Sequence, residues 1–497
     1  MEISFIGLSV AAAVWLLGRL LGSPVLVALI MSVGFGSTSA VKLSALGGSS
    51  PLLYLVFELV LVGWVLFDRR QLAAVTACLS RDWVSWAVVA LIVYAGLGAV
   101  IMPRLFADAT TAFVAGRSTG VVEVALTPNS GNISQTGYFI LGCLVFFALS
   151  ARFSRGEPLT ALRDGFLALA TLNAISGVID LGAKMAGAGD VFMPIRTATF
   201  AFLTEVEQAG FWRINGLYSE ASAFGGATLA SLAFTFTYWA HGGSRRALLL
   251  SALLFVLLVL STSSAAYGGL AVMMVPLALS LIVSGLRGRL ESTGMAVLLC
   301  LVVGIATIIF IDIWDPKILD PFQHLFQTTV LDKSESESGR ERAYWNERSL
   351  RSFFETYGLG IGFGSSRSSN WLIAVVSQLG IVGAALQIAL ILPFLRRPRR
   401  PQQAGPAFDA FVLHRSLCGC VLALLVGGIV AGGAADPGLL FFVALAGVLA
   451  CQARMAQGTH SIGSVSRMAA SHVPAPASPA GGQRPATRLK PHGSLSA

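Results

Sequence analysis

The first residues that could do chemistry are four polar side chains in a short stretch that leads into an apolar segment. Arg213 and Glu220 are about two helical turns apart, so they would share a face if the helix began early. An arginine there can hold a phosphate, and a carboxylate can accept a proton from a hydroxyl. Tyr218 and Ser222 are candidate substrate contacts. The alternative is an interfacial arginine that snorkels and pairs with Glu220.

A second group of polar residues lies in and just after the stretch 312–368. Arg340 and Arg342 are candidate catalytic cations there. The candidate substrate contacts are Tyr344, Gly360, Gly362, Arg367 and Asn370. The glycines alternate along the chain, so one backbone face would carry no side chains and a bulky polyanion could approach it. Because acidic residues outnumber basic ones in 312–355, a solvated surface of ion pairs is the alternative.

Metal ligands are sparse in the sequence. It contains no Asp-x-Asp and no histidine cluster. Glu205 and Glu207 could hold a divalent ion, although such a pair is more often solvated. Glu58 and Asp180 fall in apolar segments, where a carboxylate marks either a functional site or a group that its polar neighbours satisfy. We therefore predict chemistry that uses neither a metal nor a cofactor.

The composition indicates that a membrane protein positions these residues. Only 12% of the 497 residues are charged and 55% are hydrophobic, whereas soluble domains carry about 25% charged residues. The apolar runs are continuous and roughly 17–25 residues long, which indicates helices rather than barrel strands. The net charge of +9 is typical of the positive-inside bias and does not require a nucleic-acid partner. The six cysteines show no CxxC spacing and are typical of small buried side chains.

The apolar segments predict an all-α bundle of about 12–14 transmembrane helices. They lie at 4–21, 23–41, 51–67, 83–102, 136–150, 165–182, 215–240, 247–262, 266–284, 294–311, 369–395, 411–431 and 433–450. The first is interpreted as a retained helix rather than a cleaved signal peptide. Residues 1–454 form the predicted transmembrane domain, and the polar tail 455–497 is predicted to be disordered.

Loop charge predicts the orientation of this bundle. The short connecting stretches carry more Lys and Arg per residue than three long loops, which are 103–135, 183–214 and 312–368. By the positive-inside rule, the short connections are cytoplasmic and the long loops face the periplasm. Long loops in compact proteins are usually functional. We therefore expect the chemistry on the outward face.

The two polar stretches resemble the signature of the O-antigen polymerase/ligase family. That family is similar in having an Arg-x-x-Gly-(Leu/Phe)-x-Ser-(Glu/Asp) stretch at the end of one periplasmic loop, and residues 213–220 fit it. It also has a Ser/Arg-rich stretch before a Gly-x-Gly-x-Gly run in a larger loop, and residues 338–364 fit that pattern. A Gly-Ile-x-Gly element in the next helix is matched by residues 380–383.

The resemblance implies a GT-C-like inverting glycosyltransferase of the bacterial inner membrane with a periplasmic active site. Its donor and acceptor would be undecaprenyl-diphosphate-linked oligosaccharides, which it would join into O-antigen, capsule or exopolysaccharide. The family's arginines neutralise the diphosphate: Arg213 takes the first position, and either Arg342 or Arg340 takes the second. Glu220 is the candidate base. Implied partners are membrane lipid, a flippase and a chain-length regulator.

Two alternatives to the polymerase remain open. Ligase-like members of the family use a histidine shortly after the glycine run, and none stands there in this chain. The missing histidine favours a polymerase over a ligase that transfers glycan to a lipid or protein acceptor. A lipid-linked oligosaccharide flippase or secondary transporter would instead show an inverted repeat and paired broken helices, and no repeat is evident in the sequence.

Overall fold

The computed structural model describes residues 2–43, 50–116, 120–200, 202–204, 207–208, 210–288, 292–314 and 335–471, and the single residues 320, 323 and 327. The chain divides into two compact units, Met1–Met455 and Ala456–Ala497. The last helix, α16 (Leu439–Ser471), continues past 455, where the disordered tail is predicted to begin. Residues 472–497 of that predicted tail lie outside the described residues.

Each predicted apolar segment contains a helix. These helices are α1 (Phe5–Leu20), α2 (Pro24–Ser32), α3 (Tyr54–Phe67), α5 (Trp83–Leu105), α6 (Ser130–Ser154), α7 (Leu159–Met185), α8 (Ala221–Gly242), α9 (Arg245–Leu260), α10 (Ser264–Leu286), α11 (Ser292–Trp314), α14 (Trp371–Leu395), α15 (Pro406–Ala431) and α16. Within the described part of the chain, seven helices are long and apolar enough to cross a membrane: α5, α6, α7, α10, α14, α15 and α16. The predicted class, an all-α polytopic membrane bundle, is confirmed.

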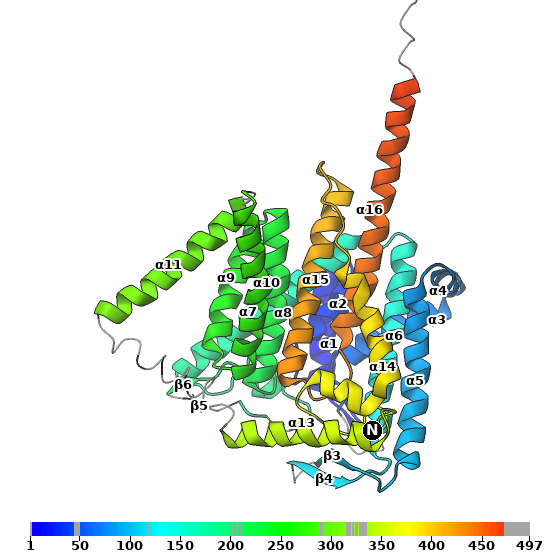
Figure 1. Cartoon of the computed structure of the whole chain (residues 1–497), viewed down its shortest axis with the longest axis vertical. Coiled ribbons are helices and arrows are strands. Elements are labelled where there is room, and N and C mark those ends of the chain that lie inside the picture. The colour runs from blue at the N-terminus through cyan, green and yellow to red at the C-terminus, as the bar shows by residue number, and fades with distance from the viewer. Residues whose placement is uncertain are drawn as a thin grey trace, which may run out of the picture. The chain divides into compact units, whose positions relative to one another are not determined.

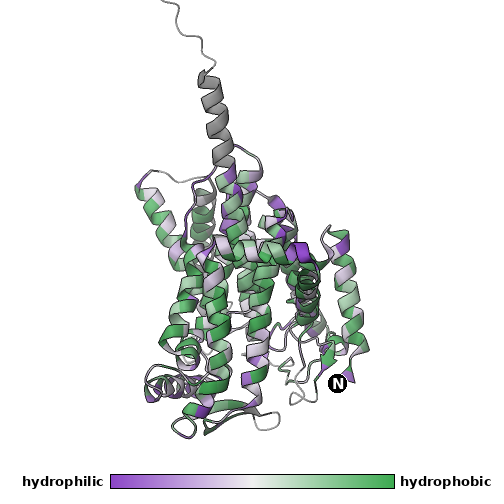
Figure 2. Ribbon diagram, turned by 90° about the vertical axis from the view of Figure 1, so that its right-hand side faces the viewer, coloured by the Kyte–Doolittle hydropathy of each residue, from purple (hydrophilic) through white to green (hydrophobic). Residues whose placement is uncertain are grey.

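The helices pack around an aromatic core. α8 lies against α7, α9, α10 and α15, and α2 contacts α1, α3 and α7. Phe166 of α7 stacks on Phe234 of α8, with the ring centroids 4.9 Å apart. Large apolar side chains also face outward along the helices, as Val275 and Leu279 do on α10, and apolar residues run along the helices in Figure 2. An apolar outer surface of this extent suits lipid.

The strands and the helix that the structure describes within the three long loops lie at one end of the bundle (Figure 1). The first carries a hairpin of β3 (Thr111–Gly116) and β4 (Gly120–Ala125), and the second carries β5 (Glu207–Gln208), β6 (Phe211–Trp212) and a 3-10 turn, Met193–Ile195. The third carries α13 (Glu337–Glu355), which runs across the ends of the membrane helices. The connection 243–244, which leads into Arg245 and Arg246 of α9, and the arginine-rich connection 396–405 lie at the opposite end. The segregation of basic and long connections that the sequence predicts is therefore present.

The second predicted membrane helix is shorter than expected. It was predicted over 23–41, but α2 ends at Ser32 and the buried chain continues without helical structure to β2 (Val41–Lys42), which pairs with β1 (Glu2–Ile3). Tertiary packing occupies this part of the chain, because a Cβ on Gly36 would press on the Tyr218 ring, with Cε1 at 3.0 Å. The freed polar groups bond to the second long loop: the Thr38 hydroxyl donates to the Ile195 carbonyl at 2.9 Å.

Amphipathic helices appear in two polar stretches where none was predicted. One is α4 (Arg69–Arg81), which packs on α6, and the other is α13. α13 is fixed to the hairpin by Arg348, whose Nε lies 3.1 Å from a Glu123 oxygen, and by Tyr344, whose hydroxyl donates to the other Glu123 oxygen at 2.5 Å. The Thr111 hydroxyl also donates to Glu123. The hairpin therefore anchors α13 over the end of the bundle.

The anchor at Glu123 should depend on pH. Hydrogen bonds from Thr111 and Tyr344, with help from Arg348, lower the pKa of Glu123 below its usual 4.5. A lowered carboxyl pKa stabilises the fold above the unfolded-state value, and this contribution is lost as the pH falls through the folded-state value. We expect Glu123→Gln to lower Tm at pH 7, and the difference from wild type to shrink below about pH 4.5. Glu347→Gln, an exposed change on α13, is the control; a Tm difference that stays constant with pH would refute the coupling.

Candidate functional site

Two arginines from different loops lie within electrostatic range of each other at the loop-bearing end of the bundle. Arg213 ends the second long loop, and Arg342 lies near the start of α13. Burial lowers the pKa of Arg213, the negative charge of Glu220 raises it, and the positive charge of Arg342 lowers it further. Glu220 and Arg342 each act on Arg213, so both lie within electrostatic range of it. The structure thus brings together the two arginines and the carboxylate that the sequence singles out.

Neither of the two arginines, Arg213 and Arg342, is held in an ion pair by a carboxylate of the described residues. The Arg213 Nε atom is buried without a hydrogen-bond partner among the described residues. A half-buried guanidinium pair with unused donors is an unfavourable arrangement unless an anion joins it. The site is therefore suited to a ligand with at least two negative charges.

Glu220 reaches this site by a different route from the one predicted. Arg213 and Glu220 do not share a helical face, because α8 begins only at Ala221 and Gly216 has a φ of +52°. The chain instead turns between them, with the Tyr218 amide donating to the Asn215 carbonyl at 3.0 Å. Glu220 is the N-cap of α8, and the Ser222 hydroxyl donates to its Oε1 at 2.6 Å. Ser222 thus orients a carboxylate whose charge acts on Arg213.

The structure distinguishes the two candidate arginines on α13. Arg342 is half-buried and acts on Arg213, whereas Arg340 is exposed. Tyr344, a predicted substrate contact, instead bonds Glu123 of the hairpin, and that carboxylate raises the pKa of Tyr344. Its ring packs edge-on against Phe113 at 5.7 Å. Arg342 is therefore the better candidate for a shared site, and Tyr344 serves the anchor.

Arg367 and Asn370 lie on the segment that leads into α14. The exposed Arg367 guanidinium lies 5.9 Å from the Trp345 ring centroid, one helical turn along α13 from Arg342. The Ser369 amide donates to the Asn346 side chain of α13 at 2.8 Å. Asn370 is the N-cap of α14 and accepts from the Leu372 and Ile373 amides. Arg367 remains available to a ligand, while the Asn370 side-chain oxygen is used by the helix.

The glycine run does not offer the bare face that was predicted. Gly360 and Gly362 have φ of +84° and +93°, and both are packed against backbone. A Cβ on Gly360 would lie 2.7 Å from the Gln378 carbonyl oxygen, and one on Gly362 would lie 2.7 Å from that of Gly98. The amides of Ile361 and Gly362 donate to the carbonyls of Ser377 and Gln378. The run therefore threads the chain through the bundle, and its faces are filled by protein.

Tyr218 is likewise not an open substrate contact. Its side chain is 7% exposed, against Gly36 and edge-on to Phe224. Burial raises its pKa, and its hydroxyl has no hydrogen-bond partner among the described residues. The ring fills the core beneath the loop, so its contribution is to packing.

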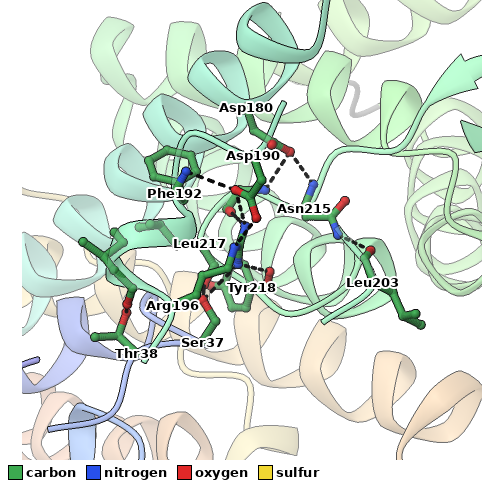
Figure 3. A network of polar contacts seen from close by, with 12 residues as sticks. Ser37, Thr38, Asp180, Asp190, Phe192, Arg196, Leu203, Asn215, Leu217 and Tyr218 are labelled. Atoms are coloured by element: carbon green, nitrogen blue, oxygen red, sulfur yellow. Dashed lines mark hydrogen bonds and ion pairs between the residues drawn. The ribbon is translucent and has the colours of Figure 1, made fainter. Parts of the chain in front are cut away.

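A network of buried charges, which the sequence analysis missed, holds the Arg213–Glu220 segment (Figure 3). Asp180 pairs with Lys184 at 3.0 Å, one turn along α7. Asp190 pairs with Arg196 at 2.7 Å in the second long loop. The spacing of Asp180 and Lys184 is a sequence signal for the first pair, whereas Arg196 has none. The Asp180 Oδ2 atom is thus satisfied by Lys184 and by two backbone amides. Its Oδ1 atom, like the Glu58 Oε2 atom of α3, is buried without a partner among the described residues.

The described residues include no group of three or more His, Cys, Asp or Glu side chains that could hold a metal ion. Glu205, half of the carboxylate pair considered for a metal, lies outside them. Searches against protein-family models and curated proteins find no match to this chain. Fold and site together define the class: a multi-pass α-helical membrane protein whose loop-bearing end carries the half-buried Arg213 within electrostatic range of Arg342 and Glu220.

Proposed function

We propose that this protein is a polysaccharide polymerase that joins undecaprenyl-diphosphate-linked oligosaccharides on the periplasmic face of a bacterial inner membrane. The observation that carries the proposal is that Arg213 lies within electrostatic range of Arg342 and Glu220, on a backbone segment that Lys184 and Arg196 hold by buried hydrogen bonds. Arg213, Arg342 and Glu220 are the positions at which the sequence resembles the O-antigen polymerase/ligase family. The basic connections at the opposite end favour a periplasmic position for the site.

The arrangement suits glycosyl transfer from a lipid diphosphate. The acceptor hydroxyl would attack the anomeric carbon of the donor while its proton passes to Glu220. The bond from that carbon to the diphosphate oxygen breaks, and the electron pair leaves with the diphosphate. Arg213 and Arg342 would stabilise the charge that builds on that oxygen. A single displacement inverts the anomeric centre.

The apolar surroundings support a lipid-linked rather than a soluble donor. Arg213 also interacts with Tyr267, at the start of α10. Beyond that first turn the large side chains of α10 face outward, so the arginine pair lies next to the lipid-facing surface. A diphosphate at the arginines could keep its polyprenyl chain in the bilayer. A soluble nucleotide-sugar would gain nothing from this position.

The test is turnover by the purified protein in nanodiscs. The substrate is undecaprenyl-diphosphate oligosaccharide, supplied with EDTA present, and products are separated by length. We expect a ladder of longer lipid-linked glycans. Transfer to an added lipid core or protein, with no ladder, would instead identify a ligase. Absence of any new glycosidic bond, with substrate crossing the membrane in vesicles, would overturn the proposal in favour of a transporter.

A further inference from the structure

Lys184 holds the Arg213 segment from the α7 side. Its side chain is 1% exposed. The Lys184 Nζ atom donates to the Arg213 carbonyl at 2.7 Å and to the Asn215 side-chain oxygen at 3.3 Å. Its partner Asp180 accepts the amides of Asn215 and Gly216 at 2.7 and 3.1 Å. The pair therefore binds both donors and acceptors of the same short backbone stretch.

Arg196 holds the same stretch from the other side (Figure 3). Its side chain is fully buried. One terminal nitrogen, Nη2, donates to the Gly216 carbonyl at 2.7 Å, and the other, Nη1, donates to the Tyr218 carbonyl at 2.5 Å. Nη1 also donates to the Ser37 hydroxyl at 2.9 Å, which links the segment to the chain after α2. Only the fork of an arginine can make these contacts together with the Asp190 pair.

These contacts determine where Arg213 lies. Between Arg213 and Tyr218, the carbonyls of Arg213, Gly216 and Tyr218 accept from buried cations. Gly216 is in the left-handed region, and a Cβ there would lie 2.9 Å from the Ser176 hydroxyl oxygen. A segment with so many fixed groups has one backbone conformation. The Arg213 side chain, which itself lacks an ion pair among the described residues, takes its position from that backbone.

We propose that Lys184 and Arg196 are positioning residues that fix the backbone of Arg213 and so set its distance from Arg342. Stability alone does not account for them, because a buried ion pair is often replaced by apolar residues without loss. Apolar residues would not supply hydrogen-bond donors to the three carbonyls of this non-helical segment. The inference deepens the proposed function, and its importance for catalysis rests on that function. The positioning of Arg213 by Lys184 and Arg196 does not depend on the proposed function.

The test measures the distance between the two arginine positions by cross-linking, without substrate. Arg213→Cys and Arg342→Cys are combined in a chain whose native cysteines are replaced, and a short bis-maleimide joins them. The yield is compared in Arg196→Lys and Lys184→Met backgrounds. Arg152→Lys is the matched control. Arg152 lies in the last turn of α6 and forms an ion pair with Glu157 at 2.8 Å.

We expect the cross-linking yield to fall several-fold in Arg196→Lys and Lys184→Met and to stay at the parent value in Arg152→Lys. Lys184→Met leaves the Asp180 carboxylate buried without its cation, which could unfold the protein. The double variant Asp180→Asn with Lys184→Met removes that buried charge. It should show the same loss of cross-linking yield, with a Tm close to that of the parent. Unchanged yields in all these backgrounds would overturn the proposal. Cross-linking needs no turnover, so a protein without glycosyl transfer could still confirm the positioning, and an active one could still refute it.

Discussion

Replacing either Arg213 or Arg342 with alanine should lower kcat/KM for glycan extension ~100- to 1,000-fold, the usual loss when one donor to a developing charge is removed. The Arg342 charge acts on Arg213, and the buried Arg213 Nε atom has no hydrogen-bond partner among the described residues. The two guanidinium groups would stabilise one leaving group together. The double variant should therefore lose less than the product of the two single losses. The measurement is initial rates on lipid-diphosphate oligosaccharide for the four forms of a double-mutant cycle.

Arg340→Ala provides the comparison on the same helix. Arg340 is exposed and does not act on Arg213, so we expect a change of less than about threefold, as for most surface substitutions. Arg351→Ala, exposed on α13, controls for loss of positive charge from the helix. If Arg340→Ala were as damaging as Arg342→Ala, or if the single losses multiplied fully, the shared site would be refuted.

Gly380→Ala should have the largest effect on stability. Gly380 breaks α14 with φ 63° and ψ −164°, a conformation open almost only to glycine. A Cβ there would lie 2.5 Å from the Leu359 carbonyl carbon and closer still to the Gly358 oxygen. The backbone conformation alone costs about 1–3 kcal/mol for another residue, and the clash adds to it. The measurement is Tm and folded yield in detergent.

Gly427→Ala is the matched control for a membrane glycine. Gly427 lies within α15, and a Cβ there would meet nothing within 4 Å. Alanine in a helix interior is favoured over glycine by about 0.5–1 kcal/mol, so Tm should stay constant or rise. A Gly380→Ala protein as stable as Gly427→Ala would mean that the break in α14 is absent from the folded protein.

The membrane helices were predictable because each is a long apolar run bounded by polar residues. The prediction failed where tertiary contacts override the run, as at the end of α2, where the Tyr218 ring excludes any side chain on Gly36. It also missed α4 and α13, whose polar composition hides an amphipathic pattern. Apolar content indicates which segments lie in lipid. It does not show which polar segments fold on the surface.

The candidate site was predictable in its residues but not in its geometry. Arg213, Glu220 and Arg342 were accessible through motif and loop placement. That Arg342 rather than Arg340 meets Arg213 depends on how α13 is rotated on its hairpin anchor, and this rests on contacts far apart in the sequence. Lys184 and Arg196 bind backbone carbonyls, which every residue carries. Such contacts leave no residue-specific pattern for a sequence to show.

The measurement that tests the central claim most directly is binding of a short-chain prenyl diphosphate to the purified protein, by calorimetry with EDTA present. The claim is that Arg213 and Arg342 jointly hold a diphosphate. We expect binding to wild type that weakens at least about tenfold in Arg213→Ala and in Arg342→Ala, the loss of a charge-assisted hydrogen bond. Arg340→Ala should retain the wild-type affinity. Equal affinities across all four proteins, or no binding to wild type, would contradict the account.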